Sequence, residues 1–369
     1  MVEGYLERAG EKVARCLMAR EGLLARDWSY DYSVVFRGME MLYHLTGDAA
    51  YRDYVLNSLD QMVDSSGHMR GYRREAFNLD YLCLGKDILW CLRETGEEKY
   101  RLAAKALYSQ LEEQPRTSDG GFWHKQVYPY QMWLDGQHMA VPFYVEAAKT
   151  FGEEEKVVDA LRQLVLAWEH TLDPVTGLPC HGWDEQKVQI WADPETGRAR
   201  HAWGRAVGWY MVALADTLSQ VDPGVTGYRE VLEIFGTLTC RLLAIRQEGV
   251  WLQVLDCPGR CGNYLESSGS SQMVYAMLRG ARAGLLPEDV EREAMESYRA
   301  LQRQFLGRMR SGEYFIAKCC QGAGLGGSGG RDGSFDYYIS ETVTSFDLKG
   351  TGAFIQAASE AERREMNVC

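Results

Sequence analysis

The sequence predicts an all-α protein, a toroid of six helical hairpins that forms one domain over residues 1–369. Apolar residues recur at helical spacing in segment after segment of the chain. A short junction also recurs about every 50 residues, a spacing typical of helical-hairpin arrays. Glycine in this junction suits the residue after a finishing helix, and an acidic residue suits the first turn of the next. The copies are Thr46-Gly47-Asp48, Thr95-Gly96-Glu97 and, more loosely, Phe151-Gly152-Glu153.

Start and stop signals separate seven expected helices in the first half of the chain. Asp31, Asp80 and Asp135 stand where helices begin, because a short carboxylate accepts hydrogen bonds from the free N–H groups there. The junction glycines, together with Pro115 and Pro174, mark helix ends. The expected helices cover about residues 2–20, 31–46, 48–65, 80–95, 97–114, 135–151 and 153–173.

The second half shows the pattern more weakly and starts with a long loop. Turn signals at residues 173–177 and 193–197 predict a short hairpin in this loop. In a ring of hairpins every even-numbered helix runs the same way, so the N-termini of these helices and the long loops before them gather at one end. We expect the functional site at that end. Further helices are expected at about residues 203–221, 226–246, 268–284, 288–309 and from 349 onward.

Composition and charge exclude several classes of partner. The net charge of −12 argues against nucleic acid, because a polyanion would be repelled. No apolar run reaches the roughly 18 residues that a membrane span needs. The amphipathic, acidic N-terminus is unlike a secretory signal, so we expect a cytoplasmic protein. The ten cysteines include Cys257 and Cys261 but no C-x-x-C pair, so no metal or cofactor is expected.

The segment from residue 122 to residue 151 holds the first candidate for chemistry, Asp135, at the start of a helix. Helix capping alone explains an aspartate there. The loop before it favours a second interpretation, in which aromatic rings beside a carboxylate bind a sugar-like ligand. The side chains concerned are Trp123, His124, Lys125, Tyr128, Tyr130 and Trp133.

Asp80 is the second candidate acid, one hairpin earlier and at the same end of the expected ring. A helix cap is again the simpler interpretation. If the two acids lie close together, their repulsion raises one pKa, as proton donation to a sugar requires. The positive end of the helix dipole favours the charged form of Asp135 instead. The sequence leaves open which effect is larger.

The second half adds His181 and the segment WGRAVGW at residues 203–209. Arg205 and Trp209 are four residues apart and share one helix face. Arginine is suited to bidentate binding of a carboxylate, although a structural cation–π pair is an equal alternative. Residues 323–341 are glycine-rich but lack the G-K-[ST] of a phosphate loop. They are expected either to bring backbone close to a ligand or to form a flexible flap.

Four motifs together resemble glycoside hydrolase family 105, the unsaturated rhamnogalacturonyl hydrolases, and the related family 88, the unsaturated glucuronyl hydrolases. The motifs occur in matching order, and the resemblance spans about residues 80–352. It implies an (α/α)6 barrel, in agreement with the hairpin count. The motifs are W-L-D-G-x-x-M-A-x-P-F from Trp133, W-G-R-A-x-G-W-Y from Trp203, S-G-S-S from Ser268, and G-L-G-G-x-x-x-R-D-G-S-F-x-Y-Y from Gly324.

The resemblance also implies a substrate and roles for individual residues. The substrate would be an oligosaccharide with a Δ4,5-unsaturated uronic acid at its non-reducing end, left by a polysaccharide lyase, with galacturonic acid from pectin expected first. Asp135 would protonate C4 of the enol ether and activate the water that adds at C5; the hemiketal then opens and releases the neighbouring sugar. Asp80 would bind hydroxyls and tune Asp135. The residues expected to bind the sugar are His124, Lys125, Trp133, His181, Arg205 and Trp209, with Arg205 or Lys125 at the carboxylate.

Two departures from the family pattern, at Ser328 and at Glu341-Thr-Val, touch the loop over the expected pocket and leave the preferred leaving sugar open. Unsaturated glucuronic acid also stays open as the substrate. Two other interpretations remain. One is an inverting glycosidase on saturated sugars, which needs carboxylates about 6.5–9.5 Å apart. The other is a non-catalytic sugar-binding toroid.

Overall fold

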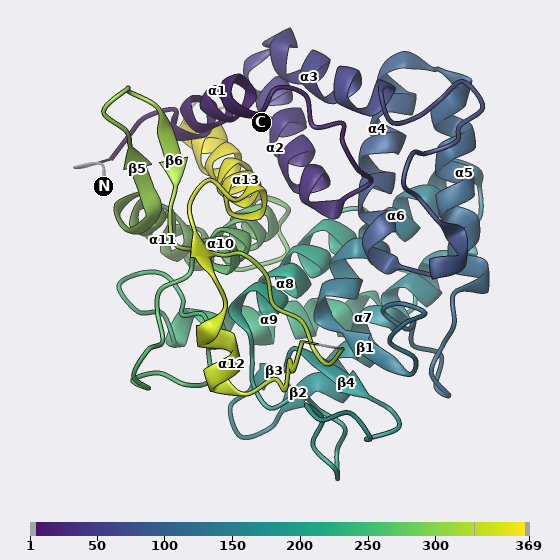
Figure 1. Cartoon of the computed structure of the whole chain (residues 1–369), viewed down its shortest axis with the longest axis vertical. Coiled ribbons are helices and arrows are strands. Elements are labelled where there is room, and N and C mark those ends of the chain that lie inside the picture. Colours follow the sequence, from purple (N-terminus) through teal and green to yellow (C-terminus); the bar gives the residue numbers. More distant parts are fainter. Residues whose placement is uncertain (1–4, 328, 366–369) are drawn as a thin grey trace.

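Six α-helices form a closed inner ring, in which each helix packs against the next and the last returns to the first (Figure 1). The protein is seen here in a computed structural model that describes residues 5–327 and 329–365. The predicted toroid of six hairpins is therefore confirmed. In ring order the inner helices are α2 (Tyr30–Thr46), α4 (Gly85–Thr95), α6 (Leu134–Phe151), α8 (Gly204–Leu218), α10 (Ser267–Arg282) and α13 (Leu348–Glu365).

An outer layer of helices packs around this ring. The two layers differ as their sequences require. Every residue of α8 is buried, because apolar residues predominate on all its sides. An outer helix such as α11 buries one face and exposes a charged one. The outer helices are α1 (Ala9–Glu21), α3 (Ala49–Asp60), α5 (Glu98–Glu113), α7 (Val157–Thr171), α9 (Tyr228–Ala244) and α11 (Glu288–Phe305).

The repeated glycine junctions are tight reversals from an inner to an outer helix. Gly47, Gly96 and Gly152 adopt left-handed backbone angles, with φ of 72°, 71° and 77°. Glycine takes this conformation without the steric cost that a side chain brings. The Gly47 N–H donates to the Tyr43 carbonyl at 2.8 Å, which satisfies one free carbonyl at the end of α2.

A close backbone approach between α13 and α2 closes the ring. A Cβ atom at Gly352 would lie 2.7 Å from the carbonyl carbon of Val34. On the facing helix, a Cβ atom at Gly38 would lie 2.9 Å from the Ile355 side chain. Nε2 of Gln356 also donates to the Val34 carbonyl at 2.7 Å. The seam therefore depends on small residues on both helices.

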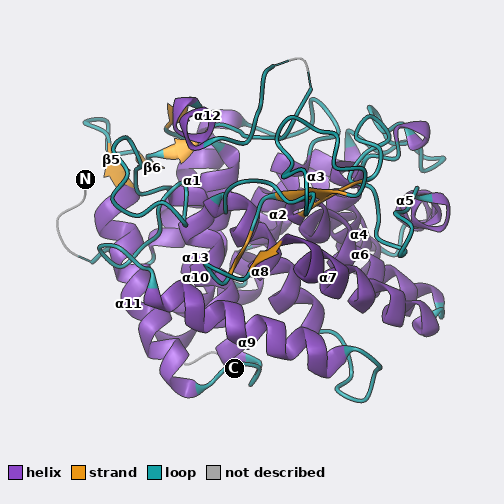
Figure 2. Ribbon diagram, turned by 90° about the horizontal axis from the view of Figure 1, so that it is seen from below, coloured by secondary structure: helices purple, strands orange, loops and turns teal. Residues whose placement is uncertain are grey.

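Long loops gather at one end of the ring, on the upper side in Figure 2. They contain four small antiparallel sheets and the short helix α12 (Phe335–Ser340). The hairpin predicted near residue 173 is formed by β2 (Leu172–Asp173) and β3 (Leu178–Pro179). The other pairs are β1 (Gln131–Trp133) with β4 (Gly182–Asp184), β5 (Leu306–Arg308) with β6 (Tyr314–Ile316), and β7 (Cys319–Cys320) with β8 (Val343–Thr344).

The departure from the expected helices that bears on the functional site is at the fourth one, which does not begin at Asp80. The 3₁₀ segment η2 (Leu79–Leu84) precedes α4 there. Asn78 caps this segment, because its side-chain oxygen accepts the Asp80 N–H at 3.0 Å. The cap interpretation of Asp80 is therefore wrong, and its carboxylate is left for other contacts. Two further 3₁₀ turns are η1 (Arg74–Ala76) and η3 (Glu154–Lys156).

The N-terminal end of the chain and the glycine-rich segment also differ from what the sequence predicted. The first helix begins at Ala9 and not near residue 2 as expected, because residues 5–8 are not helical; residues 1–4 lie outside the described residues. Ser328 also lies outside them. The glycine-rich segment leads into α12, which Ser334 caps and which the sequence did not predict. Among the helices of the described residues, none combines the length and hydrophobicity needed to cross a membrane.

Candidate active site

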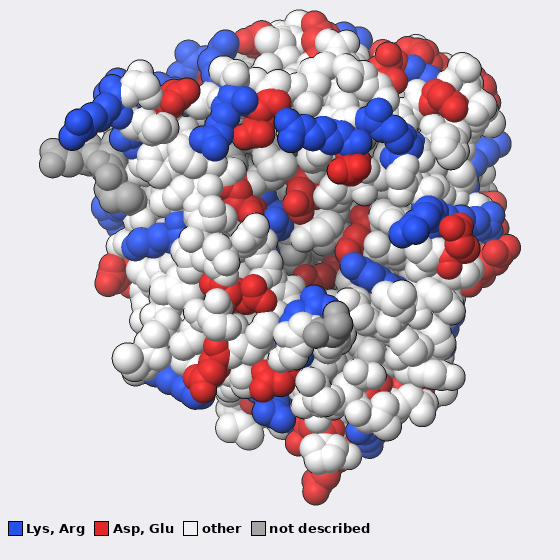
Figure 3. Space-filling model, in the orientation of Figure 1, with Lys and Arg blue, Asp and Glu red and all other residues white. Residues whose placement is uncertain are grey.

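The face that carries the long loops is hollowed at its centre, and acidic side chains gather in the hollow (Figure 3). One strand pair sets the geometry at the start of α6. β1 pairs with β4 so that Trp133 faces Gly182, and the Leu134 N–H then donates to the His181 carbonyl at 3.0 Å. Asp135, the second residue of α6, thereby meets His181 although the two are far apart in the chain.

Asp135 and His181 face each other across 3.2 Å, from Oδ2 to Nε2. Both atoms are buried, and neither has a hydrogen bond of regular geometry to any other described residue. The Tyr338 hydroxyl lies 2.8 Å from Nδ1 of His181. Burial raises the pKa of the Tyr338 phenol well above its ordinary value, so the hydroxyl keeps its proton. When this hydroxyl donates to Nδ1, the ring proton of His181 is on Nε2 and faces Asp135.

The structure brings two histidines to Asp135, and they act on its pKa beside the effects weighed from the sequence. Burial alone raises the pKa of its carboxyl, but the His181 and His124 rings lower it, and the net pKa is below its ordinary value. The carboxylate is therefore ionised in the free protein at neutral pH. Its side chain remains 14% exposed, so a ligand can reach it.

Asp80 lies between a lysine and a histidine. Its Oδ2 is 2.5 Å from Nζ of Lys125, and its Oδ1 is 3.5 Å from Nε2 of His124. Burial lowers the pKa of His124 to about 4, which outweighs the opposing effect of Asp80. His124 is therefore neutral above that pH, and the ion pair of this group is the one between Asp80 and Lys125.

His124 also connects the two acids. Its Nδ1 rests against α6, where a Cβ atom added at Gly136 would lie only 2.9 Å away. The ring therefore touches Asp80 through one nitrogen and the residue after Asp135 through the other. Asp80 and Asp135 lie at the same end of the ring, on either side of this imidazole.

The two tryptophans expected to stack on a sugar are almost completely buried. The Trp133 ring stacks on His124 at 4.6 Å and on Tyr128 at 4.7 Å between ring centroids. The Trp209 ring stacks on His138 at 4.5 Å and is 2% exposed. Protein rings thus cover much of both indoles, and their part in sugar binding stays a prediction.

Arg205 is buried in the first turn of α8, with 1% of the residue exposed. Its Nη1 donates to the Cys320 carbonyl at 2.5 Å and to the Ser268 hydroxyl at 3.3 Å. The guanidinium also lies over the indole of Trp203, so the cation–π contact involves Trp203 rather than Trp209. Arg205 forms no direct ion pair with a carboxylate of the described chain; the Glu266 carboxylate, which accepts from the Ser268 hydroxyl, acts on it from farther away.

The structure adds groups that the sequence did not assign. Tyr338 falls within the last motif, but only the folded chain shows that it holds His181. Nζ of Lys349 lies 3.4 Å from Oδ2 of Asp31 and 3.2 Å from Oδ1 of Asp347. Both Asp31 and Lys349 were expected at N-termini of inner helices, and that position was the signal available in the sequence.

Comparisons of the sequence and of the structure with known proteins identify related glycoside hydrolases. The sequence profile described as Glycosyl Hydrolase Family 88 matches residues 12–365. The solved structure of a family 105 glycoside hydrolase from C. acetobutylicum ATCC 824 superposes with a TM-score of 0.94 at 39% identity, covering 96% of this chain and 99% of that one. The unsaturated rhamnogalacturonyl hydrolase YesR of Bacillus subtilis is 25% identical over 265 residues, which are 69% of this chain and 71% of YesR. The unsaturated glucuronyl hydrolase of Bacillus sp. GL1 shares the fold, with a TM-score of 0.69 at 15% identity and coverage of 97% and 96%.

Proposed function

This chain belongs to the glycoside hydrolases of families 88 and 105, and from that premise we propose that it removes a Δ4,5-unsaturated galacturonic acid from the non-reducing end of an oligosaccharide. The relationship to YesR supports the choice of this sugar. Polysaccharide lyases generate such ends when they cleave pectin-type chains by elimination. A cytoplasmic location, expected from the sequence, stays a prediction.

The buried contact between Asp135 and His181 is the observation that carries the proposal. Two polar atoms that are buried without regular hydrogen bonds are costly, and natural sites retain them where a ligand completes the bonding. A carboxylate in this position can accept a proton and return it, which is what acid–base catalysis on an enol ether requires.

We infer that Asp135 delivers a proton to C4 of the C4=C5 double bond. The charge that develops at C5 and the ring oxygen is quenched by a water molecule, which bonds to C5 and gives up a proton to the carboxylate. The product is a hemiketal at C5. Opening of the hemiketal breaks the ring, and the open-chain form releases the neighbouring sugar.

Asp135 must first gain a proton, because its carboxyl is ionised in the free protein. Binding of the substrate is expected to cause this protonation of Asp135. The substrate's own carboxylate brings a second negative charge next to Asp135 and displaces water, and both effects raise the pKa of a buried acid. His181 then holds the protonated or ionised oxygen in place through Nε2.

The substrate carboxylate is proposed to bind Arg205, since that guanidinium is buried and its direct hydrogen bonds go to neutral groups of the described chain. Lys125 is already neutralised by Asp80. The pair of Asp80 and Lys125, together with His124, is therefore proposed to bind sugar hydroxyls, for which both donors and acceptors are needed.

The experiment follows the ultraviolet absorbance of the enol ether conjugated with its carboxylate. Wild-type protein should remove this absorbance from unsaturated galacturonyl-rhamnose, and Asp135→Asn should reduce the rate by about 10²–10⁴-fold, the usual range for a lost acid–base group. Asp119→Asn is the matched control, because it disrupts another Asp–His contact, 2.5 Å from Oδ2 to Nε2 of His170, on the outer helix α7.

Other outcomes separate the alternatives. Faster turnover of unsaturated glucuronyl disaccharides would indicate that glucuronic acid is the preferred sugar and would leave the proposed hydration reaction unchanged. Cleavage of saturated glycosides with no loss of the chromophore would contradict the proposed reaction and indicate an inverting glycosidase. Binding without turnover of any of these sugars would indicate a non-catalytic toroid.

A further inference from the structure

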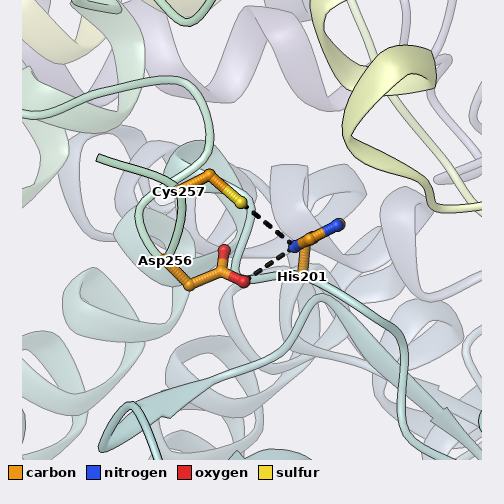
Figure 4. A group of neighbouring side chains, drawn as sticks. All are labelled: His201, Asp256 and Cys257. Carbon is orange, nitrogen blue, oxygen red and sulfur yellow. Dashed lines mark hydrogen bonds and ion pairs between the residues drawn. The ribbon is translucent and has the colours of Figure 1, made fainter. Parts of the chain in front are cut away.

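Three potential metal ligands meet outside the candidate active site, on the loops around the start of α8 (Figure 4). Nδ1 of His201 lies 2.7 Å from Oδ2 of Asp256 and 3.5 Å from Sγ of Cys257. The three donor atoms are all within 4.8 Å of one another, and each residue is partly buried. Cys257 is a free cysteine. Both dashed contacts in Figure 4 converge on the same imidazole nitrogen.

Nδ1 of His201 makes a hydrogen bond with Asp256 at 2.7 Å, and Sγ of Cys257 lies farther from the same nitrogen, beside Arg260. Because Nδ1 offers one proton or one lone pair, it makes a full hydrogen bond with only one of the two groups. A cation between the three atoms would contact all of them at once. We propose that His201, Asp256 and Cys257 bind a divalent transition-metal ion of the zinc type.

The donor set selects this class of ion. Thiolate sulfur and imidazole nitrogen are ligands of Zn²⁺, whereas Mg²⁺ and Ca²⁺ take oxygen donors. Tetrahedral zinc ligands stand about 2.0–2.3 Å from the ion and so about 3.4 Å from each other, which shifts of about 1 Å achieve here. The thiol releases its proton to solvent as the sulfur binds. A water molecule fills the fourth position, because three protein ligands leave it open.

The backbone around the three ligands is already fixed. The Ala202 N–H donates to Oδ1 of Asp256 at 3.1 Å, and the Leu255 N–H donates to the Ala202 carbonyl at 2.9 Å. Nδ2 of Asn263 donates to the carbonyls of Val254 and Cys257 at 2.8 and 3.0 Å. The segments that carry the ligands are therefore tied to each other and to the turn at Asn263, so little entropy is lost when an ion binds.

The site adjoins the candidate active site through the main chain. The His201 carbonyl accepts the His181 N–H at 3.1 Å. An ion at His201 therefore stabilises the segment that presents His181 to Asp135. Metal binding itself does not depend on the proposed reaction, and its test needs no substrate.

Cobalt titration of the full-length protein tests the proposal. The protein is stripped with a chelator and titrated with Co²⁺, because a cobalt–thiolate bond gives a charge-transfer band in the near ultraviolet. Wild type should bind one Co²⁺ per chain with this band, and Zn²⁺ should displace it. Cys257→Ser should remove the band, and His201→Asn should weaken Co²⁺ binding at least tenfold.

Cys261→Ser is the matched control, because Cys261 is an exposed cysteine four residues along the same loop. It should keep the band and the stoichiometry. A band that disappears in Cys261→Ser but persists in Cys257→Ser would overturn the assignment. So would the absence of a stoichiometric band in wild type, or equal affinity in wild type and His201→Asn. Circular dichroism and thermal unfolding of each variant separate loss of the site from loss of the fold.

Discussion

Nζ of Lys125 lies 2.5 Å from Oδ2 of Asp80, so each of these two charged groups has its counterion within the protein. Arg205 is the opposite case, a buried guanidinium with hydrogen bonds to neutral groups and no ion pair to a described carboxylate. This contrast distinguishes two residues that the sequence left equal as partners of a substrate carboxylate. It also leads to separate predictions for each.

Arg205→Lys should lower kcat/KM for an unsaturated uronide by about 10²-fold, because lysine lacks the planar fork that binds a carboxylate through two nitrogens. The methyl ester of the same substrate carries no charge, so wild type and variant should turn it over at similar rates. Arg246→Lys, which alters an ion pair with Glu293 beyond the end of α9, is the control. An equal loss on acid and ester would assign Arg205 to the fold rather than to the substrate.

Asp80→Asn should destabilise the protein by about 1–3 kcal/mol, because it leaves the largely buried ammonium of Lys125 without its counterion. Urea unfolding measures this change. Glu112→Gln removes an exposed partner of Lys156 and should cost less than about 1 kcal/mol. If both variants unfold at the same urea concentration, the ion pair between Asp80 and Lys125 contributes no more than a surface pair.

Tyr338→Phe should lower kcat about tenfold with little change in KM. Without the hydroxyl, the His181 ring proton can move to Nδ1 and leave a lone pair facing Asp135. Asp135 then loses the contact that lowers its pKa, so the basic limb of the kcat/KM profile, where the proton destined for C4 is lost, should move to higher pH. Tyr337→Phe, which loses a hydrogen bond from the Gly324 N–H and one with Glu341, should leave the profile in place.

His124 should make folding stability depend on pH. Its pKa falls from 6.5 to about 4 on folding, so between these values the unfolded chain binds more protons than the folded one. The contribution of His124 to the free energy of unfolding is fully present above pH 6.5. It is lost as the pH falls toward 4, by up to about 3 kcal/mol. His124→Gln should flatten the pH dependence of unfolding over this window. His68→Gln removes an exposed histidine and is the control; an equal flattening there would contradict the assignment.

The repeat and the ring were predictable because they depend on local chemistry. Gly47 and Gly96 mark helix ends wherever they occur, since few other residues adopt their backbone angles without strain. The prediction that a helix begins at Asp80 was wrong, and the reason is also a matter of local chemistry. Asn78, two residues earlier, competes for the same backbone N–H groups, and its side chain caps the segment.

Contacts between segments that are far apart in the chain could not be predicted from the sequence. The meeting of Asp135 and His181 depends on the register of β1 against β4, which no local pattern specifies. Arg205 was expected beside Trp209 from helical spacing, but the guanidinium turns back over Trp203, which is two residues earlier and so outside the periodic pattern. His201 and Cys257 are likewise joined only by tertiary folding, so a search for C-x-x-C spacing missed them.

The seam between α13 and α2 has a consequence for synthesis on the ribosome. Val34 is translated long before its partner Gly352. Until α13 has been made, the nascent chain is an open arc whose apolar inner helices have no final neighbour, the condition in which newly made proteins aggregate. Folding helpers that shield such surfaces should matter most for this chain before the synthesis of α13.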